Sequence, residues 1–342
     1  MIVITLVLFQ TSGSSQTKKA QYNVYSVAFY NMENLFDTIN DPIKRDDDFL
    51  PQGSYKWTSK RYNAKLKRMA HIISKLGTET TGGVPPTVFG LSEIETRGVV
   101  EDLISQSPLN KYPYKIAHIP SPDHRGVDVA LVYRSDIFKM DKYYAKELWV
   151  KNAYKNFATR NQLVVEGTLA DERIAFLVNH WPSRAAGSRY REAAGALNRS
   201  IIDSLRKVYN NNIHCITMGD LNDDPVSKSL TKGLRAVGDK DKLSEKNILY
   251  NPMYKMYKRG LGTLAYRDSW NLFDQIILTK ELVEKKDKSK LMYYKTEICN
   301  YDELKNKSGR YKGYPFRTYA GGNYAGGYSD HFPVIVFLVK KK

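Results

Sequence analysis

Asp220 and Asn222 stand two residues apart in the segment TMGDLNDDP, which covers residues 217–225 and overlaps an apolar run. That run, residues 213–218, predicts a buried strand, and alternation along extended chain would place both side chains on one side. A carboxylate can take a proton from water, and a carboxamide can orient an oxygen without adding charge. The pair therefore suits metal and phosphate chemistry, although Asn-Asp-Asp-Pro also forms ordinary turns.

Polar residues stand at the ends of several other predicted strands. Asn31 and Glu33 follow the apolar run 24–30, Glu93 follows the run 87–91, and His180 follows the run 173–178. Asp274 stands near the start of the run 273–278, and Asp330 and His331 precede the run 334–339. One such residue usually forms a turn or a hydrogen bond, but this many in one context indicate a shared active-site mouth. Carboxylates, amides and histidines without cysteine favour Mg²⁺, with Mn²⁺ or Ca²⁺ as alternatives, over zinc. The set indicates phosphoester hydrolysis.

Asp128 is a further charged residue, and it lies inside the apolar run 127–133. A charge inside such a strand is costly unless it is paired. Asp128 is therefore expected to have a buried partner.

The segments between these residues predict a single α/β domain over residues 21–342. Amphipathic periodicity predicts helices over 59–76 and 188–208. Strands are expected over 115–119 and 127–133, and a hairpin over 162–169 and 173–178. Residues 295–327 are expected to form a surface loop, and the tyrosines within 311–328 could stack bases or pack on one another.

The composition is that of an ordinary globular chain of 342 residues, but its formal net charge is +17. Such a charge favours binding of polyanions, and it is equally consistent with a solvated basic surface. Arg184, Arg189 and Arg191 cluster at the start of the helix 188–208, where they could contact phosphates or simply be solvated. Cys215 and Cys299 show no metal-binding spacing, and no disulfide is expected.

The first 20 residues differ from the rest. An apolar run over residues 2–9 is followed by small polar residues, which is typical of a signal segment for export. A buried first strand is the alternative. No other segment is apolar and long enough to span a membrane.

The motifs together resemble the endonuclease/exonuclease/phosphatase superfamily, which includes pancreatic-type deoxyribonucleases and apurinic endonucleases. In order along the chain they are FYNMENLFD, LSEIET, GVDVALVYR, NHWPSR, MGDLND, LFDQIIL and YSDHFPV. The resemblance implies a four-layer α/β sandwich in which two mixed sheets pack face to face with helices outside. The sequence departs from the family pattern at Glu33, where many members have Asp or a non-acidic residue, and at the Tyr/Gly-rich loop before Ser329.

The resemblance also implies residue roles. Glu93 would be the main metal ligand, with Asn31, Glu33 and Asp330 around the ion. Asp220 would activate the attacking water. Among the remaining implied roles, Asn222 would hold a phosphate oxygen, His331 oriented by Asp274 would stabilise the phosphorane or protonate the leaving oxygen, and His180 paired with Asp128 would contact the phosphate. The arginine cluster itself, rather than the resemblance, leads us to expect that Arg184 and Arg191 bind substrate phosphates.

Three functions are compatible with these observations. The first is an exported, monomeric, metal-dependent nuclease or phosphodiesterase, which the charge and the arginine cluster favour. The second is a phosphatase or phospholipase of the same fold that acts on a sugar or inositol phosphate or on a phospholipid. The third is a non-catalytic polyanion-binding protein, and the intact set of acids, amides and histidines argues against it.

Overall fold

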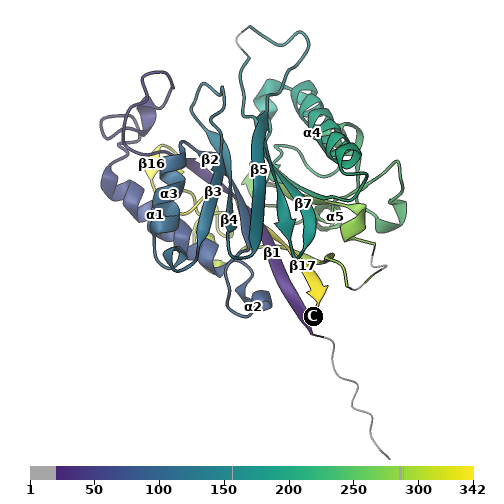
Figure 1. Cartoon of the computed structure of the whole chain (residues 1–342). Coiled ribbons are helices and arrows are strands. Elements are labelled where there is room, and N and C mark those ends of the chain that lie inside the picture. Colours follow the sequence, from purple (N-terminus) through teal and green to yellow (C-terminus); the bar gives the residue numbers. More distant parts are fainter. Residues whose placement is uncertain (1–20, 156, 285–286, 288) are drawn as a thin grey trace, which may run out of the picture.

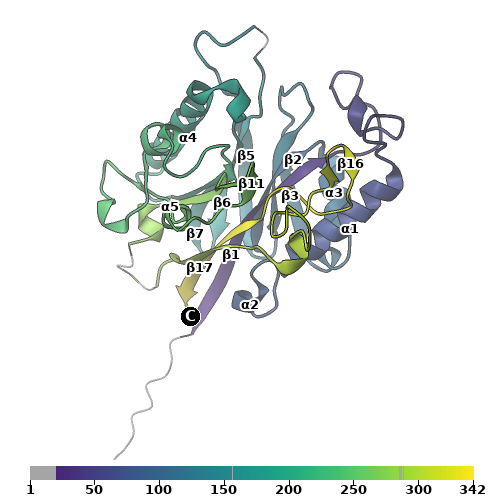
Figure 2. The same ribbon diagram turned by 180° about the vertical axis from the view of Figure 1, so that it is seen from behind.

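The computed structural model describes residues 21–342 except 156, 285, 286 and 288, so the predicted signal segment lies outside the described residues. In the described part, two large mixed sheets pack face to face (Figure 1, and from behind in Figure 2). Within the same residues, no helix has both the length and the apolar character needed to cross a membrane.

The first sheet has the strand order β14-β17-β1-β2-β4-β3. β1 pairs in parallel with β2 and antiparallel with β17, so the sheet is mixed. The strands of this sheet are β1 (Tyr22–Leu35), β2 (Val88–Ile94), β3 (Tyr114–His118), β4 (Asp128–Arg134), β14 (Met292–Ile298) and β17 (Val334–Lys341).

The second sheet has the order β5-β6-β7-β8-β13-β10-β9. β7 and β8 are parallel, whereas β8 and β13 are antiparallel. The strands are β5 (Phe138–Lys146), β6 (Gln162–Leu169), β7 (Glu172–His180), β8 (His214–Asp220), β9 (Ala236–Val237), β10 (Leu249–Tyr250) and β13 (Asp274–Thr279).

Helices cover the outer faces of both sheets. α1 and α3 lie on the side of the first sheet, and α4 lies on the side of the second (Figure 1). The helices are α1 (Ser59–Lys75), α2 (Thr78–Thr81), α3 (Arg97–Ser105), α4 (Ser188–Val208) and α5 (Met253–Lys258). The strands outside the two large sheets form two small hairpins: β11 (Leu264–Tyr266) with β12 (Ser269–Asn271), and β15 (Tyr319–Ala320) with β16 (Asn323–Tyr324).

Apolar clusters fill the interfaces between these layers. One lies between the sheets and contains Phe29 and Phe176. Another lies between the first sheet and α1 and contains Tyr30 and Met69. A third, with Ile202 of α4, lies against the outer face of the second sheet. Because successive residues of β1 face opposite sides of the strand, one strand contributes to two cores. The predicted four-layer α/β sandwich is confirmed.

Two edge strands were not predicted from the sequence. β5 carries lysines through most of its length and lies at the edge of the second sheet. β14 occupies part of the expected surface loop 295–327 and lies at the edge of the first sheet. Charged residues are common on edge strands because they prevent pairing with other chains, and they obscure the apolar alternation on which strand prediction relies.

Gly219 allows β8 to approach β7 just before the polar end of the strand. It is opposite Asn179 in the parallel register. A Cβ on Gly219 would lie 2.2 Å from the main-chain oxygen of Asn179. Only glycine fits there without moving the two strands apart.

Gly219→Ala should therefore reduce the free energy of unfolding by about 1–3 kcal/mol, the usual cost of overpacking. The measurement is urea unfolding followed by circular dichroism. The control is Gly98→Ala in α3, where the nearest atom to the added Cβ would be the Thr96 hydroxyl at 3.4 Å and where alanine favours the helix. Equal stability of the two variants would contradict the close-approach argument.

Candidate active site

Three polar side chains of the second sheet lie in one row because of the strand register. His180, the last residue of β7, is opposite Asp220 at the end of β8. Asp274, the first residue of β13, is opposite Asp220 from the other side. All three are buried, with exposed fractions of 4%, 3% and 0% respectively. Residues far apart in the sequence thus form one row along the end of the sheet.

The first sheet contributes Asn31 and Glu93 from its parallel strands β1 and β2. Asn31 is opposite Ser92, and the register then shifts so that Glu93 lies in a bulge. Glu93 has a φ of 56°, and Glu33 two residues beyond Asn31 has a φ of 46°. Left-handed backbone is costly for residues other than glycine and concentrates at functional sites. The Glu93 carboxylate accepts a hydrogen bond from the Asn34 main-chain N–H at 3.0 Å, which helps to hold this conformation.

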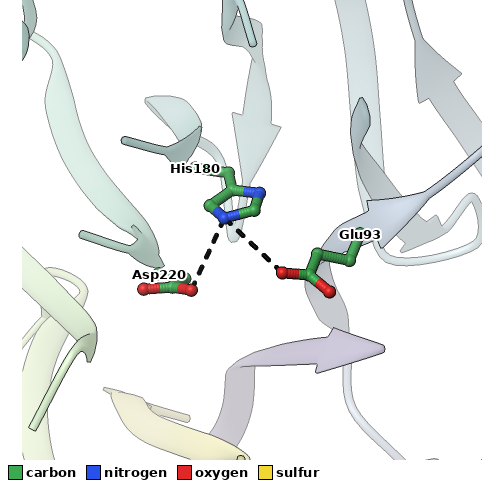
Figure 3. A group of neighbouring side chains, drawn as sticks. All are labelled: Glu93, His180 and Asp220. Atoms are coloured by element: carbon green, nitrogen blue, oxygen red, sulfur yellow. Dashed lines mark ion pairs between the residues drawn. The ribbon is translucent and has the colours of Figure 1, made fainter. Parts of the chain in front are cut away.

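Side chains from the two sheets meet across the interface between them. Asn31 donates from Nδ2 to Asp220 Oδ2 at 3.1 Å. His180 Nε2 lies 3.7 Å from Glu93 Oε1 and 3.6 Å from Asp220 Oδ2 (Figure 3). The site therefore lies at the interface between the two sheets, and each sheet contributes residues to it.

His331 reaches the same place from the loop before β17. Its Nδ1 lies 2.6 Å from Asp274 Oδ2, so the expected contact between these two residues is present. The Ser329 hydroxyl donates to the main-chain oxygen of Asn31 at 2.7 Å and accepts from the His331 main-chain N–H at 3.1 Å. These bonds fix the loop against β1. His331 Nε2 then lies 3.9 Å from Asp220 Oδ2.

Glu93, His180 and Asp220 form a group that could hold a metal ion, since one ligand atom from each lies within 4.8 Å of the others (Figure 3). Two carboxylates with the adjacent carboxamide of Asn31 are a suitable donor set for a divalent cation. Glu93 is thus placed as expected for a ligand.

Glu33 and Asp330, the other two expected ligands, have partners of their own. Glu33 Oε2 accepts from the Thr318 main-chain N–H at 2.6 Å, and its Oε1 lies 3.5 Å from Arg317 Nε. Asp330 Oδ2 accepts from Arg317 at 2.5 Å. Arg317 contacts both Glu33 and Asp330. Of the three carboxylates expected to bind the metal, Glu93 is the one that belongs to the candidate metal-binding group.

The two site histidines have opposite electrostatic environments. Burial lowers the pKa of His180 well below its usual value, and the nearby Arg160 and Arg125 lower it further. Burial also acts to lower the pKa of His331, but Asp274 and Asp330 outweigh it and raise that pKa well above its usual value. At neutral pH the first is a neutral imidazole and the second an imidazolium, which can donate from both ring nitrogens.

Asp220 lies between these histidines, and its environment makes it a better base. Burial raises the pKa of Asp220 to about 7, an increase that His331 opposes and that Asp274 and Glu93 reinforce. A carboxylate with a pKa near neutrality is suited to accept a proton. Asn222 supports this carboxylate by donating its main-chain N–H to Asp220 Oδ1 at 2.9 Å.

The expected pairing of Asp128 with His180 is wrong. Asp128 Oδ2 lies 3.0 Å from His118 Nε2, and its Oδ1 accepts from the Ser121 main-chain N–H at 2.9 Å. His180 Nδ1 has no hydrogen-bond partner among the described residues. The buried charge of Asp128 is satisfied within the hairpin β3–β4, so it supports that hairpin and does not orient the site histidine.

The arginines expected to bind substrate are both paired with carboxylates of the protein. Arg191 is 5% exposed, and its Nε lies 2.9 Å from Asp223 Oδ2. Arg184 donates to Asp224 at 2.8 Å, although almost half of its side chain is exposed. The expectation for Arg191 is corrected, because its charge neutralises a buried carboxylate. Arg184 lies at the surface but is already paired.

Several residues near the site were not identified from the sequence. Arg160 is buried and donates to the main-chain oxygens of His180 and Trp181 at 3.2 and 2.7 Å. Lys65 of α1 is fully buried and donates to the main-chain oxygen of Glu33 at 2.6 Å. Neither residue belongs to an apolar or polar pattern that marks a strand end. A lysine on the apolar face of the helix 59–76 was the one available signal.

Arg191→Met should reduce the free energy of unfolding by about 3 kcal/mol, because it leaves the buried Asp223 with only the more distant and half-exposed Arg184, at 3.7 Å. Arg189→Met, two residues earlier on the exposed side of α4, should cost less than about 1 kcal/mol. Denaturant unfolding of both variants provides the comparison. A stable Arg191→Met variant would restore this residue as a candidate for binding substrate.

Comparison of the chain with known proteins identifies its family. The sequence profile of the Endonuclease/Exonuclease/phosphatase family matches residues 26–340. No curated protein sequence matches the chain significantly.

Solved structures with a similar fold include a humanized D. rerio TDP2 carrying 14 mutations, at 13% identity and a TM-score of 0.55, covering 92% of this chain and 99% of that one. The mannosyl-6-phosphatase of Bacteroides thetaiotaomicron VPI-5482 shows 16% identity and a TM-score of 0.55 with the same coverage. D. rerio TDP2 complexed with a single-strand DNA product shows 15% identity and a TM-score of 0.53, covering 92% and 98%. Since the profile matches almost the whole described chain, the protein belongs to the endonuclease/exonuclease/phosphatase family, whose enzymes are divalent-metal-dependent phosphoester hydrolases.

Proposed function

We propose that this protein is a phosphodiester hydrolase that uses Mg²⁺ or a similar divalent cation. The observation that carries the proposal is the position of Asp220 between two histidines of opposite charge state, with His180 Nε2 at 3.6 Å and His331 Nε2 at 3.9 Å. In-line attack on a phosphate requires a base for the attacking water and a donor for the phosphate or leaving oxygen, and this group of side chains contains both.

Each residue then has a chemical task. Asp220 accepts the proton of the attacking water, since its pKa of about 7 suits a general base. His331, held by Asp274 at 2.6 Å, donates to the phosphate oxygen or the leaving oxygen. The neutral His180 contacts the phosphate. A divalent cation bound at Glu93 supplies positive charge that neutralises the phosphate.

Asn222 supports the same geometry. Its side chain donates to the main-chain oxygen of Trp181 at 3.0 Å, which fixes the turn after β8. A carboxamide nitrogen carries two N–H donors, so one remains to hold a phosphate oxygen, as expected from the sequence.

Two half-exposed arginines near the site histidines favour a diester over a monoester, because each keeps N–H donors beyond its contact with a carboxylate of the protein. The Arg125 side chain is 50% exposed, and it lies near enough to His180 to lower that residue's pKa. The Arg317 side chain is also 50% exposed, and it contacts Asp330 next to His331. Cations near both histidines suit a substrate whose phosphates extend to either side of the scissile bond. The solved complex of a TDP2 with single-strand DNA product is consistent with such a substrate.

A phosphomonoesterase is the second candidate. The specific observation in its favour is that Arg184 and Arg191 are paired with Asp224 and Asp223, which removes cations that a polymer would use. The similar fold of a mannosyl-6-phosphatase supports the same alternative.

The substrate class is decided by comparing bis(p-nitrophenyl) phosphate with p-nitrophenyl phosphate in the presence of Mg²⁺. We expect kcat/KM to be at least about tenfold higher for the diester, equivalent to about 1.4 kcal/mol of transition-state stabilisation. EDTA should abolish both reactions, and Mg²⁺ or Mn²⁺ should restore them. Faster turnover of the monoester, or of mannose 6-phosphate, would establish the phosphatase instead.

The division between metal binding and proton transfer gives a second test. Glu93→Gln should weaken Mn²⁺ binding in titration calorimetry. His331→Gln should leave Mn²⁺ affinity nearly unchanged and reduce turnover about a hundredfold, the usual contribution of a general acid. His71→Gln is the control, since that side chain is 53% exposed on α1. Equal loss of metal affinity in the Glu93 and His331 variants would disprove this division of roles.

A further inference from the structure

A cavity of about 310 Å³ adjoins the candidate active site. It lies between the turn of the hairpin β11–β12 and the loop from Asn306 to Ala325. Arg317 and Asp330 line this cavity, and Asp330 is also the residue next to His331. A part of the substrate that bound in the cavity would therefore lie close to the phosphate at the active site.

Tyrosine rings form much of the cavity wall. Tyr266 and Tyr311 are 61% and 54% exposed. The rings of Tyr311 and Tyr314 have centroids 5.7 Å apart, and Trp270 lies 5.6 Å from Tyr314 on the far side. Large aromatic rings left open to solvent beside an active site offer flat surfaces on which another ring can stack.

The two carboxylates that line the cavity already have partners in the protein. Asp268 already accepts from the Tyr314 hydroxyl at 2.8 Å and lies 3.5 Å from Arg310. Asp330 accepts from Arg317 at 2.5 Å. The wall also contains Arg267, and the guanidinium groups of Arg310 and Arg317 keep N–H donors beyond those that face the carboxylates. Such a wall favours a ligand rich in acceptor atoms.

The loop that forms the cavity is anchored to the active site. Thr318 donates its main-chain N–H to Glu33 at 2.6 Å, and Lys65 donates to the Thr318 hydroxyl at 2.8 Å. Thr318 itself is 2% exposed. Buried hydrogen bonds therefore hold the loop at Thr318, next to the cavity residue Arg317, against the active site.

We infer that this cavity binds the nucleoside adjacent to the scissile phosphodiester, with its base stacked on Tyr311 and the neighbouring phosphate or base carbonyls bound by the arginines. This inference rests on the proposed function. A nucleobase has both a π face and acceptor atoms, whereas a sugar needs acceptors for its hydroxyl groups, and the two cavity carboxylates are engaged. A volume of about 310 Å³ is at the lower end for ligand pockets, which suits one nucleoside of a single strand.

The test compares three esters with the same p-nitrophenolate leaving group: the p-nitrophenyl esters of thymidine 5′-phosphate and thymidine 3′-phosphate, and methyl p-nitrophenyl phosphate. The wild-type protein should prefer one of the nucleoside esters over the methyl ester by about tenfold in kcat/KM, as expected for one base–aromatic contact. Tyr311→Ala should abolish most of that preference, and Tyr311→Phe should retain it. Tyr294→Ala is the matched control, because Tyr294 is equally exposed, at 54%, on β14 outside the cavity.

The outcomes separate this inference from the proposed function. Hydrolysis of all three esters without a nucleoside preference, or with a preference that Tyr311→Ala leaves intact, overturns the inference while the diesterase stands. If no ester is hydrolysed, the proposed function fails, and calorimetric binding of thymidine 3′,5′-bisphosphate decides the inference. Binding that Tyr311→Ala weakens about tenfold and Tyr294→Ala does not would support it, and absent binding would overturn it.

Discussion

The burial of the Asp220 carboxylate is the constraint on which the site depends. A buried carboxylate is tolerated only where nearby groups compensate its charge and satisfy its oxygens. Here Asn31 and the main chain of Asn222 donate to it, and His331 lies close enough to oppose the rise in its pKa. Glu93 and Asp274 add two more carboxylates to the same surroundings. When all three carboxylates are ionised and His331 is an imidazolium, two negative charges remain, which a single divalent cation would balance.

That balance requires both sheets. Asp220, His180 and Asp274 belong to the second sheet, and Asn31 and Glu93 belong to the first. The close packing of the sheets brings the two groups together, and the bulge at Glu93 turns its side chain toward the interface between the sheets. The apolar interface between the sheets therefore has a chemical consequence, because it sets the distances between the base, the histidines and the metal ligands.

The positions of the site residues could be predicted from the sequence, but several of their partners could not. The ends of apolar runs are recognisable because they stop at polar residues: Asp220 does end its strand, whereas Asn31 lies within β1, which continues to Leu35. Partners depend on register and side-chain direction. His118 is opposite Ala130 in the hairpin β3–β4, so it lies near Asp128 through a local turn, and this local contact prevails over the expected distant one with His180.

The pairing of charges near the site could not be predicted for a related reason. The basic cluster at the start of α4 is visible in the sequence, whereas the pattern around Asp223 and Asp224 predicts only the turn after Asn222. In the fold they neutralise Arg191 and Arg184. A count of like charges along the chain does not reveal which of them face a carboxylate, because that depends on the packing of α4 against the end of β8.

Glu33 illustrates how a departure from the family pattern can acquire a different use. Burial and the nearby Asp330 raise its pKa, Lys65 and Arg317 lower it, and the resulting pKa is about 7. These two carboxylates and two cations can neutralise one another, so Glu33 and Asp330 add little charge for a metal ion. The negative charge available to a cation then resides on Glu93, Asp220 and Asp274. Glu33 instead fixes the loop through Thr318, and the longer side chain of glutamate connects the metal site to the wall of the neighbouring cavity.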